Sequence, residues 1–286
     1  MSSSTAISTD AARGITFTLD LEDGRESGAE ANRFVGVTRR LLSFLAEREV
    51  RGTVFVVGEL AAEHPDLVRD VADRGHEIAL HAYRHVPLTQ LDAATFRADT
   101  RKGKALLEDL TGRAVAGYRA PLFSLVRATT WAADILGELG FSYSSSVLPA
   151  KSPLFGFPGC PASPFTWPCG LVELPVPVAA IGATGIPFLG GVYLRILPWP
   201  IVRLGLASCA RRQSLWTYCH AHDFDPEEPF RMIDGLGWAG SRLFFARRAR
   251  MFDRIDRLIR QGVGPALADR VAAGIAAAPI SASLLV

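Results

Sequence analysis

The sequence predicts an α/β fold, in which helices cover a parallel sheet that is closed or nearly closed. Between Ile15 and Val147, short apolar runs alternate with segments whose apolar residues recur at helical spacing, a pattern typical of parallel sheets. Apolar residues make up 49% of the chain and charged residues 21%, which indicates a globular protein with a large core. At 286 residues, the chain is long enough for one large α/β domain or two small ones.

The first half of the chain carries the most regular part of this pattern. In the first expected strand, Phe17 and Leu19 alternate with Thr18 and Asp20, which places apolar and polar side chains on opposite faces. Strands are expected at residues 15–21, 53–57, 76–81, 115–119 and 141–147. Helices are expected at residues 34–48, 64–75, 92–110 and 129–139, each with apolar residues on one face.

The second half is less regular. Residues 149–170 contain six prolines and are expected to form a long loop over one rim of the sheet. Strands are expected at 172–178 and 214–219, and helices at 199–212, at 239–261 and over the last twenty residues. We expect a flexible N-terminal tail at 1–14 and one domain over 15–286, with the C-terminal helices of 239–286 packed on it.

One of the two longest stretches without a charged residue runs from Leu174 to Leu194. Its prolines remove helical hydrogen bonds that lipid cannot replace, so we expect a buried strand followed by apolar loops. The alternative is a surface that contacts membrane lipid, because large apolar side chains lie close together in sequence. These are Phe188, Leu189, Tyr193, Leu197, Trp199 and Ile201.

Charge and cysteine content exclude several classes of protein. The net charge is only +2, so we expect no nucleic-acid partner. The four cysteines form no Cys-x-x-Cys pair, which argues against a disulfide or zinc framework.

Residues 1–13 lack the apolar segment of a secretory signal, so we expect a cytoplasmic protein. Seven arginines in the expected helix 239–261 are interpreted as a solvated face, with contact to anionic lipid or polymer as the alternative.

Polar residues follow the expected strands, at the rim where barrels of this kind carry their active sites. They are Asp20, Glu22 and Asp23, then His81 and His85, then Arg119 and Pro121, and finally His220, His222 and Asp223. His81 and His85 are about one helical turn apart if the loop coils, so their imidazoles could share one metal ion. Two histidines and a carboxylate leave a coordination position for water. The alternative is a structural buried His81 and a surface His85.

Four motifs occur in a characteristic order: Asp20-Leu-Glu-Asp-Gly24, His81-x-x-x-His85, Arg119-Ala-Pro121 and Tyr218-Cys-His220. This order resembles the polysaccharide deacetylases of carbohydrate esterase family 4, the NodB-homology domain. Residues 58–146, 191–198 and 223–226 resemble its exopolysaccharide-cluster branch, the one associated with exosortase and PEP-CTERM proteins. The resemblance covers about residues 15–260 and implies a distorted (β/α)7-type barrel, with an irregular C-terminal extension.

The activity implied by this resemblance is metal-dependent hydrolysis of an N-acetyl group from an amino sugar. The cofactor implied is a divalent metal, with zinc preferred and cobalt, manganese and nickel as alternatives. By resemblance, Asp20 is the base, His220 the acid and Arg119 the residue that positions the base, while His81 and His85 bind the metal. The residues expected to contact substrate are Tyr118, Pro121, Phe123 and His222, although His222 could also be a surface histidine.

The first and fifth strands depart from the common form of the family. The usual adjacent aspartates are replaced here by Asp20, Glu22 and Asp23. Strand alternation puts Asp20 and Glu22 on one face, so Glu22 is the preferred metal ligand and Asp23 the second choice; Asp23 could instead bond the turn at Gly24. Serines follow Tyr143 where related sequences carry an acid, so we expect an accessory polar contact to be missing.

The expected substrate is an N-acetylated saccharide in a lipid-linked or nucleotide-linked intermediate. We expect the apolar loops near 186–201 to face the lipid, or the inner surface of the membrane to which the protein would bind peripherally. The alternatives are a deformylase or ureide-type C–N hydrolase on the same fold, and a catalytically inactive saccharide-binding protein.

Overall fold

The computed structural model describes residues 14–23, 32–152, 154–181, 184–209 and 214–285. The tail expected at residues 1–14 lies outside these residues apart from Gly14. In the described part of the first half, strands and helices alternate as the sequence predicts, except that two helices, at 58–63 and 65–73, separate the second and third strands, where one was expected at 64–75. The elements are β1 (Thr18–Leu21), α1 (Arg33–Ala46), β2 (Thr53–Val56), α2 (Gly58–Glu63), α3 (Pro65–Asp73), β3 (Glu77–Leu80), α4 (Ala93–Thr111), β4 (Gly117–Tyr118), α5 (Trp131–Glu138) and β5 (Tyr143–Ser144).

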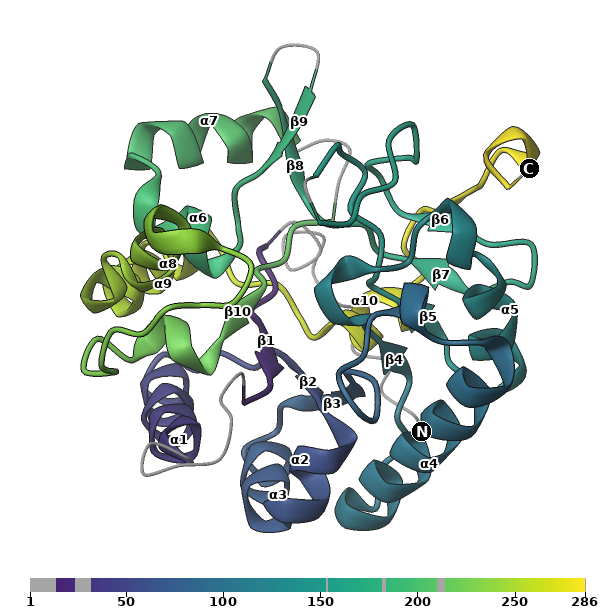
Figure 1. Ribbon diagram of the computed structural model, residues 1–286, viewed down its shortest axis with the longest axis horizontal. Helices are drawn as coiled ribbons and strands as arrows, with labels where there is room; N and C mark the ends of the chain where they lie inside the picture. The colour runs from purple at the N-terminus through teal and green to yellow at the C-terminus, as the bar shows by residue number, and fades with distance from the viewer. Residues whose placement is uncertain (1–13, 24–31, 153, 182–183, 210–213, 286) are drawn as a thin grey trace, which may run out of the picture.

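The second half adds short strands and a group of helices at one side of the molecule (Figure 1). These elements are β6 (Phe165–Thr166), β7 (Val172–Glu173), β8 (Val178–Ile181), β9 (Thr184–Pro187), α6 (Gly191–Ile196), α7 (Trp199–Cys209), β10 (Cys219–His220), the 3-10 helix η5 (Ala221–Phe224), α8 (Gly237–Phe245), α9 (Met251–Ile259), α10 (Leu267–Ala272) and β11 (Ala278–Pro279).

The strands form one mostly parallel sheet in the order β10-β1-β2-β3-β4-β5-β7-β6-β11, with helices around it (Figure 1). Only the β6–β7 pair of this sheet is antiparallel among the described residues, and β8 and β9 form a separate hairpin. Buried apolar side chains from the strands and the surrounding helices make up the main core. The predicted α/β fold with a parallel sheet is confirmed.

Strand β1 lies between β2 and β10 and therefore joins the two halves of the chain. In the ladder, Asp20 is opposite Phe55 on one side and His220 on the other. Leu19 and Leu21 point into the core that the helices cover, whereas Asp20 points toward Arg119 on the other face. The alternation of β1 thus turns Asp20 to the face of the sheet opposite the core that the helices cover, and Arg119 reaches it there.

The strands of the second half differ from those expected, because prolines interrupt one expected strand and an expected loop contains a strand. The strand expected at 172–178 is two strands, β7 and β8, because Pro175 and Pro177 between them cannot donate ladder hydrogen bonds. The loop expected at 149–170 contains β6, which pairs with β7. The helix expected at 199–212 is α7, described as far as Cys209.

The C-terminal helices are shorter than expected. The single helix expected at 239–261 is α8 and α9, separated at Arg247, whose φ of 57° is left-handed and cannot continue a helix. The expected terminal helix is limited to α10, which is followed by Gly274 at φ 78° and then by β11. Arg248 and Arg254 are buried, so the arginines of this region do not all lie on a solvated face as expected.

Two of the side chains expected on a lipid-facing loop are in the core. Phe188 and Leu189 are buried, and Phe188 packs so closely on Gly205 of α7 that an added Cβ would lie 2.7 Å from its ring. The expectation that these two residues face lipid is therefore wrong, whereas Tyr193 and Ile201 are exposed. Among the described residues, every helix is too short or too polar to cross a membrane.

His76 gives the fold a predictable response to acid. Burial and the nearby Arg74 and Arg51 lower the pKa of His76 to about 4, although Asp70 opposes them, and its Nδ1 accepts a hydrogen bond of 3.1 Å from the Gly52 N–H. Because this pKa is below its unfolded value, the unfolded state binds more protons between about pH 6.5 and pH 4.

We expect the neutral His76 to stabilise the fold fully above pH 6.5 and to lose up to roughly 2–3 kcal/mol of that contribution as the pH falls to 4. Urea unfolding of the wild type and of His76→Gln at several pH values measures this. The glutamine keeps an acceptor but does not titrate, so the stability of the variant should fall less with acid. Parallel pH curves for the two proteins would contradict the assignment.

Candidate active site

Glu22, His81 and His85 bring one donor atom each to within 4.8 Å of the others, beyond the carboxyl ends of β1 and β3. His81 Nε2 is 3.5 Å from Glu22 Oε2, and His85 Nε2 contacts the same oxygen. Two imidazoles and one carboxylate suit a divalent ion such as Zn²⁺. Asp23 does not belong to this group of described residues, and Gly24, which would close its alternative turn, lies outside them.

The loop after β3 directs His85 toward His81 without forming the expected helical turn. Ala82 and His85 instead adopt left-handed conformations, with φ of 60° and 49°. Such backbone conformations are unfavourable for residues with side chains and are frequent at functional sites. The two rings lie 5.0 Å apart. His81 Nδ1 donates to the Arg119 carbonyl oxygen at 3.0 Å, which orients the ring and leaves Nε2 toward Glu22.

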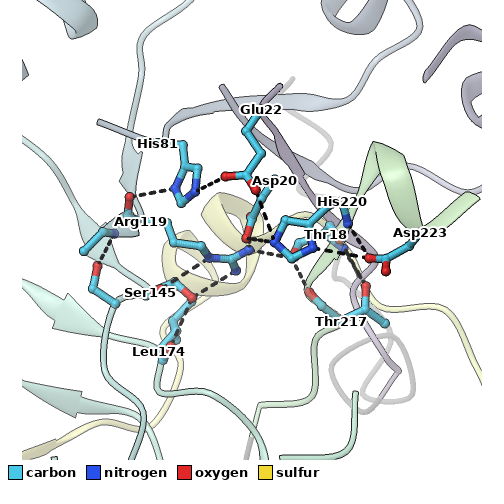
Figure 2. A network of polar contacts seen from close by, with 12 residues as sticks. Thr18, Asp20, Glu22, His81, Arg119, Ser145, Leu174, Thr217, His220 and Asp223 are labelled. Carbon is cyan, nitrogen blue, oxygen red and sulfur yellow. Dashed lines mark hydrogen bonds and ion pairs between the residues drawn. The ribbon is translucent and has the colours of Figure 1, made fainter. Parts of the chain in front are cut away.

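A buried ion pair between Arg119 and Asp20 lies beside this group (Figure 2). Arg119 Nη1 donates to Asp20 Oδ1 at 2.5 Å, and Nη2 donates to Ser145 Oγ at 3.1 Å. The guanidinium carbon lies 3.8 Å from the ring centre of Phe55 and 4.4 Å from that of Trp216. Hydrogen bonds and two aromatic faces therefore fix Arg119, which in turn fixes one oxygen of Asp20 and leaves the other facing the site.

His220 faces the same space from β10 (Figure 2). Its Nε2 is 3.9 Å from Asp20 Oδ2 and 3.8 Å from Glu22 Oε1. Its Nδ1 is 3.3 Å from Asp223 Oδ2, an oxygen that also accepts from the His220 N–H at 2.8 Å. The other oxygen of Asp223 is 2.8 Å from Arg195 Nη2, and both of these side chains are fully buried. Asp223 therefore orients His220, and Arg195 balances its charge.

These contacts shift the pKa values of the group. Burial opposes ionisation of Glu22, but His85 and His220 outweigh it and hold the pKa of Glu22 well below its usual value. Burial also acts against protonated His220, but the hydrogen bond to Asp223 and the charge of Glu22 raise the pKa of His220 to about 9. Burial lowers the pKa of His222 to about 3, so this ring is neutral where it stacks on His220 at 4.9 Å.

A cavity of about 800 Å³ opens beside these groups. Its lining combines polar residues with apolar residues, most of which come from the segment 228–244. The polar residues are Glu22, Asp23, His220, His222, Glu228, Arg231 and Asp234, and the apolar ones are Phe34, Leu122, Pro229, Phe230, Met232, Ile233 and Phe244. A ligand in this space would meet charged groups and an apolar wall together.

The residues expected to contact substrate do not all lie in this cavity. Tyr118 is fully buried, with its ring packed on Phe96 and Phe141 beneath the helices, so the expectation of a substrate contact is wrong for this residue. Pro121 is buried, and Phe123 packs on Tyr218 at 5.2 Å. His222 lines the cavity.

The side chains that support this site are not evident from the sequence. Asp223 lies at an expected strand end, but its position indicates no role for it. The serines after Tyr143 predict the loss of a polar contact, whereas Ser145 accepts a hydrogen bond from Arg119. No predicted role falls on Arg195. The sequence feature that could have indicated a role for Arg195 is its position as the first charged residue after the uncharged stretch 174–194. An arginine in such an apolar context is usually buried in an ion pair with an acidic residue.

Comparison with known proteins agrees with this geometry. Residues 11–143 match the polysaccharide deacetylase family, and residues 145–263 match a domain of unknown function (DUF3473). Over 102 residues the chain is 35% identical to a chitooligosaccharide deacetylase of Rhizobium leguminosarum bv. trifolii, an alignment that covers 35% of this chain and 44% of the relative. The chain spans less than half the length of the curated relatives it matches first.

Solved structures share the fold. A candidate polysaccharide deacetylase from Mycobacterium smegmatis has a TM-score of 0.61 at 22% identity, with 93% of this chain and 91% of that chain covered. Puue allantoinase has the same TM-score, 0.61, at 16% identity, with the same two shares covered. At these low identities the TM-scores establish a common fold alone, and the chemistry depends on the residues of the site.

In the metal-free protein we expect Asp223→Asn to lower the pKa of His220 by about one unit or more, because the variant loses the charge that favours the imidazolium. Titration of the His220 ring resonances by NMR measures the change. Asp234→Asn, an exposed acid of the same cavity, is the matched control. An unchanged His220 titration in a folded Asp223→Asn protein would show that Asp223 does not act on this ring.

Proposed function

We propose that this chain, which belongs to the polysaccharide deacetylase family through residues 11–143, hydrolyses the N-acetyl group of an amino sugar with a bound divalent cation. The observation that carries the proposal is the convergence of three kinds of group on one space. These are a cation-binding triad, a carboxylate fixed by a buried arginine, and an imidazole whose pKa is raised.

Glu22, His81 and His85 would hold the cation. Their donor atoms already lie together, and the second nitrogen of His81 is occupied by a backbone carbonyl, as is usual for a metal-binding imidazole. A cation held there would polarise the amide carbonyl and acidify a bound water. We take zinc as the first candidate because it prefers imidazole and carboxylate ligands, and cobalt, manganese and nickel as alternatives.

Asp20 would remove the proton from the attacking water. Its Oδ1 is engaged by Arg119, so Oδ2 is the oxygen available to the proton, and this atom faces the space shared with His220. A carboxylate fixed by a guanidinium does not need to reorganise during the reaction. Arg119 acts through Asp20 and is therefore a positioning residue.

His220 would donate a proton to the departing amine. Asp223 engages Nδ1, so the proton on Nε2 faces Asp20 and Glu22. A pKa of about 9 keeps the free site protonated at neutral pH, the state that a general acid requires before the C–N bond breaks. The products are acetate and the free amino sugar. The hydroxyl group of the water joins the acetyl carbon, and its proton, passed on through the site, joins the nitrogen of the amine.

The apolar wall of the cavity supports a lipid-linked saccharide as the substrate. A second candidate activity is hydrolysis of a ureide, because the allantoinase neighbour matches the fold as well as the deacetylase neighbour does. Deformylation on the same fold, and saccharide binding without catalysis, are the third and fourth candidates. Product analysis separates the hydrolases, since acetate, formate and a ureide product are distinct molecules.

We expect zinc or cobalt to raise the unfolding temperature of the metal-free protein, because a ligand at a hundredfold excess over its Kd adds about 2.7 kcal/mol of stability. His81→Ala should lose most of this effect, and His76→Gln, at the other end of the same strand, should keep it. Cobalt should also give visible absorption bands in the wild type and not in His81→Ala. Equal cation responses in His81→Ala and the wild type would refute the proposed site.

We expect the cation-loaded protein to release acetate from N-acetylated saccharides, and Asp20→Asn to lower kcat by about 10²–10⁴-fold because the variant lacks the base. A coupled acetate assay on a panel of free and lipid-linked saccharides measures this. Cation binding by Asp20→Asn, followed by thermal unfolding, reports whether the variant is folded. Full activity in Asp20→Asn would remove Asp20 from the mechanism. Cation binding without release of any acyl product would favour saccharide binding without catalysis.

A further inference from the structure

Helix α8 exposes large apolar side chains that a surface helix normally buries. Its described side chains include Trp238, exposed to 66%, and Leu243, exposed to 50%, whereas the side chain it buries fully is Ser241. Ser241 Oγ accepts from the Ile233 N–H at 2.9 Å, so the serine ties the helix to the segment before it. A surface helix normally buries its apolar side chains. In α8, Phe244 and Phe245 are half-buried, and Phe244 packs on His222 at 4.6 Å, whereas this chain leaves Trp238 and Leu243 uncovered.

The neighbouring helix α9 follows the normal rule. Met251, Ile255 and Leu258 are buried, and Arg257 and Asp253 lie outside, where they form an ion pair at 3.1 Å. The contrast shows that the exposed apolar residues of α8 are a local property of this segment and not of the whole C-terminal extension.

The segment before α8 enlarges the same surface. We define the 230–243 patch as the exposed apolar residues Phe230, Met232, Leu236, Trp238 and Leu243. The Arg242 guanidinium carbon lies 5.1 Å from the ring centre of Phe230 and 5.7 Å from that of Trp238, so it joins two parts of the patch. Large exposed apolar groups of this kind mark contact surfaces for proteins or membranes.

The patch continues into the cavity of the active site. Phe230 and Met232 line the cavity together with Glu22 and His220. A surface that binds at the patch would therefore hold its own molecules next to the catalytic groups. This continuity favours an occupant that also carries the substrate.

The charge around the patch is positive. Four exposed arginines, at 231, 242, 247 and 250, lie in or next to the patch, against two exposed acidic residues, Glu227 and Asp234. Arg248 is buried in an ion pair with Glu228 and does not contribute to this surface. Exposed aromatic and aliphatic side chains bordered by arginines are typical of segments that lie at the surface of anionic membranes. A symmetric contact with a second copy would instead bring like charges together.

We propose that the 230–243 patch docks on an anionic phospholipid surface and brings the active-site cavity to the headgroup level. The apolar side chains would enter the lipid interface, and the arginines would contact the headgroup phosphates. The proposal deepens the proposed function, because docking at this position would present a lipid-linked saccharide to Glu22, His81 and His220.

The experiment is sedimentation of the protein, residues 1–286, with vesicles of phosphatidylcholine, with or without phosphatidylglycerol, and without any saccharide. We expect binding to vesicles that contain phosphatidylglycerol, and about tenfold weaker binding for the Trp238→Ser, Leu243→Ser double variant. Leu154→Ser is the matched control, because Leu154 is exposed to 65% but lies outside the patch. Arg242→Gln should weaken the binding and reduce its dependence on salt.

Equal binding by the patch variant and the Leu154→Ser control would overturn the proposal, as would absence of binding by the wild type. A concentration-dependent dimer that Trp238→Ser abolishes, without vesicle binding, would assign the patch to a second copy instead. His81→Ala should bind vesicles as the wild type does. Vesicle binding without acetate release would therefore refute the proposed function alone, and acetate release without vesicle binding would refute only the docking surface.

Discussion

The buried ion pair between Arg119 and Asp20 is the interaction on which the site depends. Both side chains are almost fully removed from water, and removal of one partner from such a pair usually costs about 3–5 kcal/mol because a buried charge is left alone. The guanidinium also donates to Thr18 Oγ1 at 2.9 Å and stacks between Phe55 and Trp216. It therefore holds β1, β2, β4 and the segment before β10 in one arrangement.

The same residue connects the two functions of the site. The side chain of Arg119 fixes Asp20, and its backbone carbonyl accepts from His81 Nδ1. The proposed base and a proposed metal ligand are thus positioned by one residue that follows β4. Ser145 and the pairing of β4 with β5 hold Arg119 in this position from the neighbouring strand.

The parts of the site that sequence could predict are those set by local periodicity. Asp20, Glu22 and His81 follow from the alternation of strands and from the rule that polar residues gather where parallel strands end. Contacts between residues far apart in the chain could not be predicted in this way. The Arg195–Asp223 pair, the break at Arg247 and the burial of Phe188 each depend on how the extension packs, and local spacing carries no information about that packing.

Two family models match the two halves of the chain, but the site contains residues from both halves. The polysaccharide deacetylase match ends at residue 143 and the second match begins at 145, so the boundary falls within β5, a strand of the central sheet. The proposed base and the proposed metal ligands come from the first half, whereas His220, Asp223 and Arg195 come from the second. A first half alone would lack the proposed acid and the parallel neighbour of β1, with Asp20 at an open edge. We therefore infer that residues 15–286 form one catalytic unit, because each half lacks groups that the proposed reaction requires.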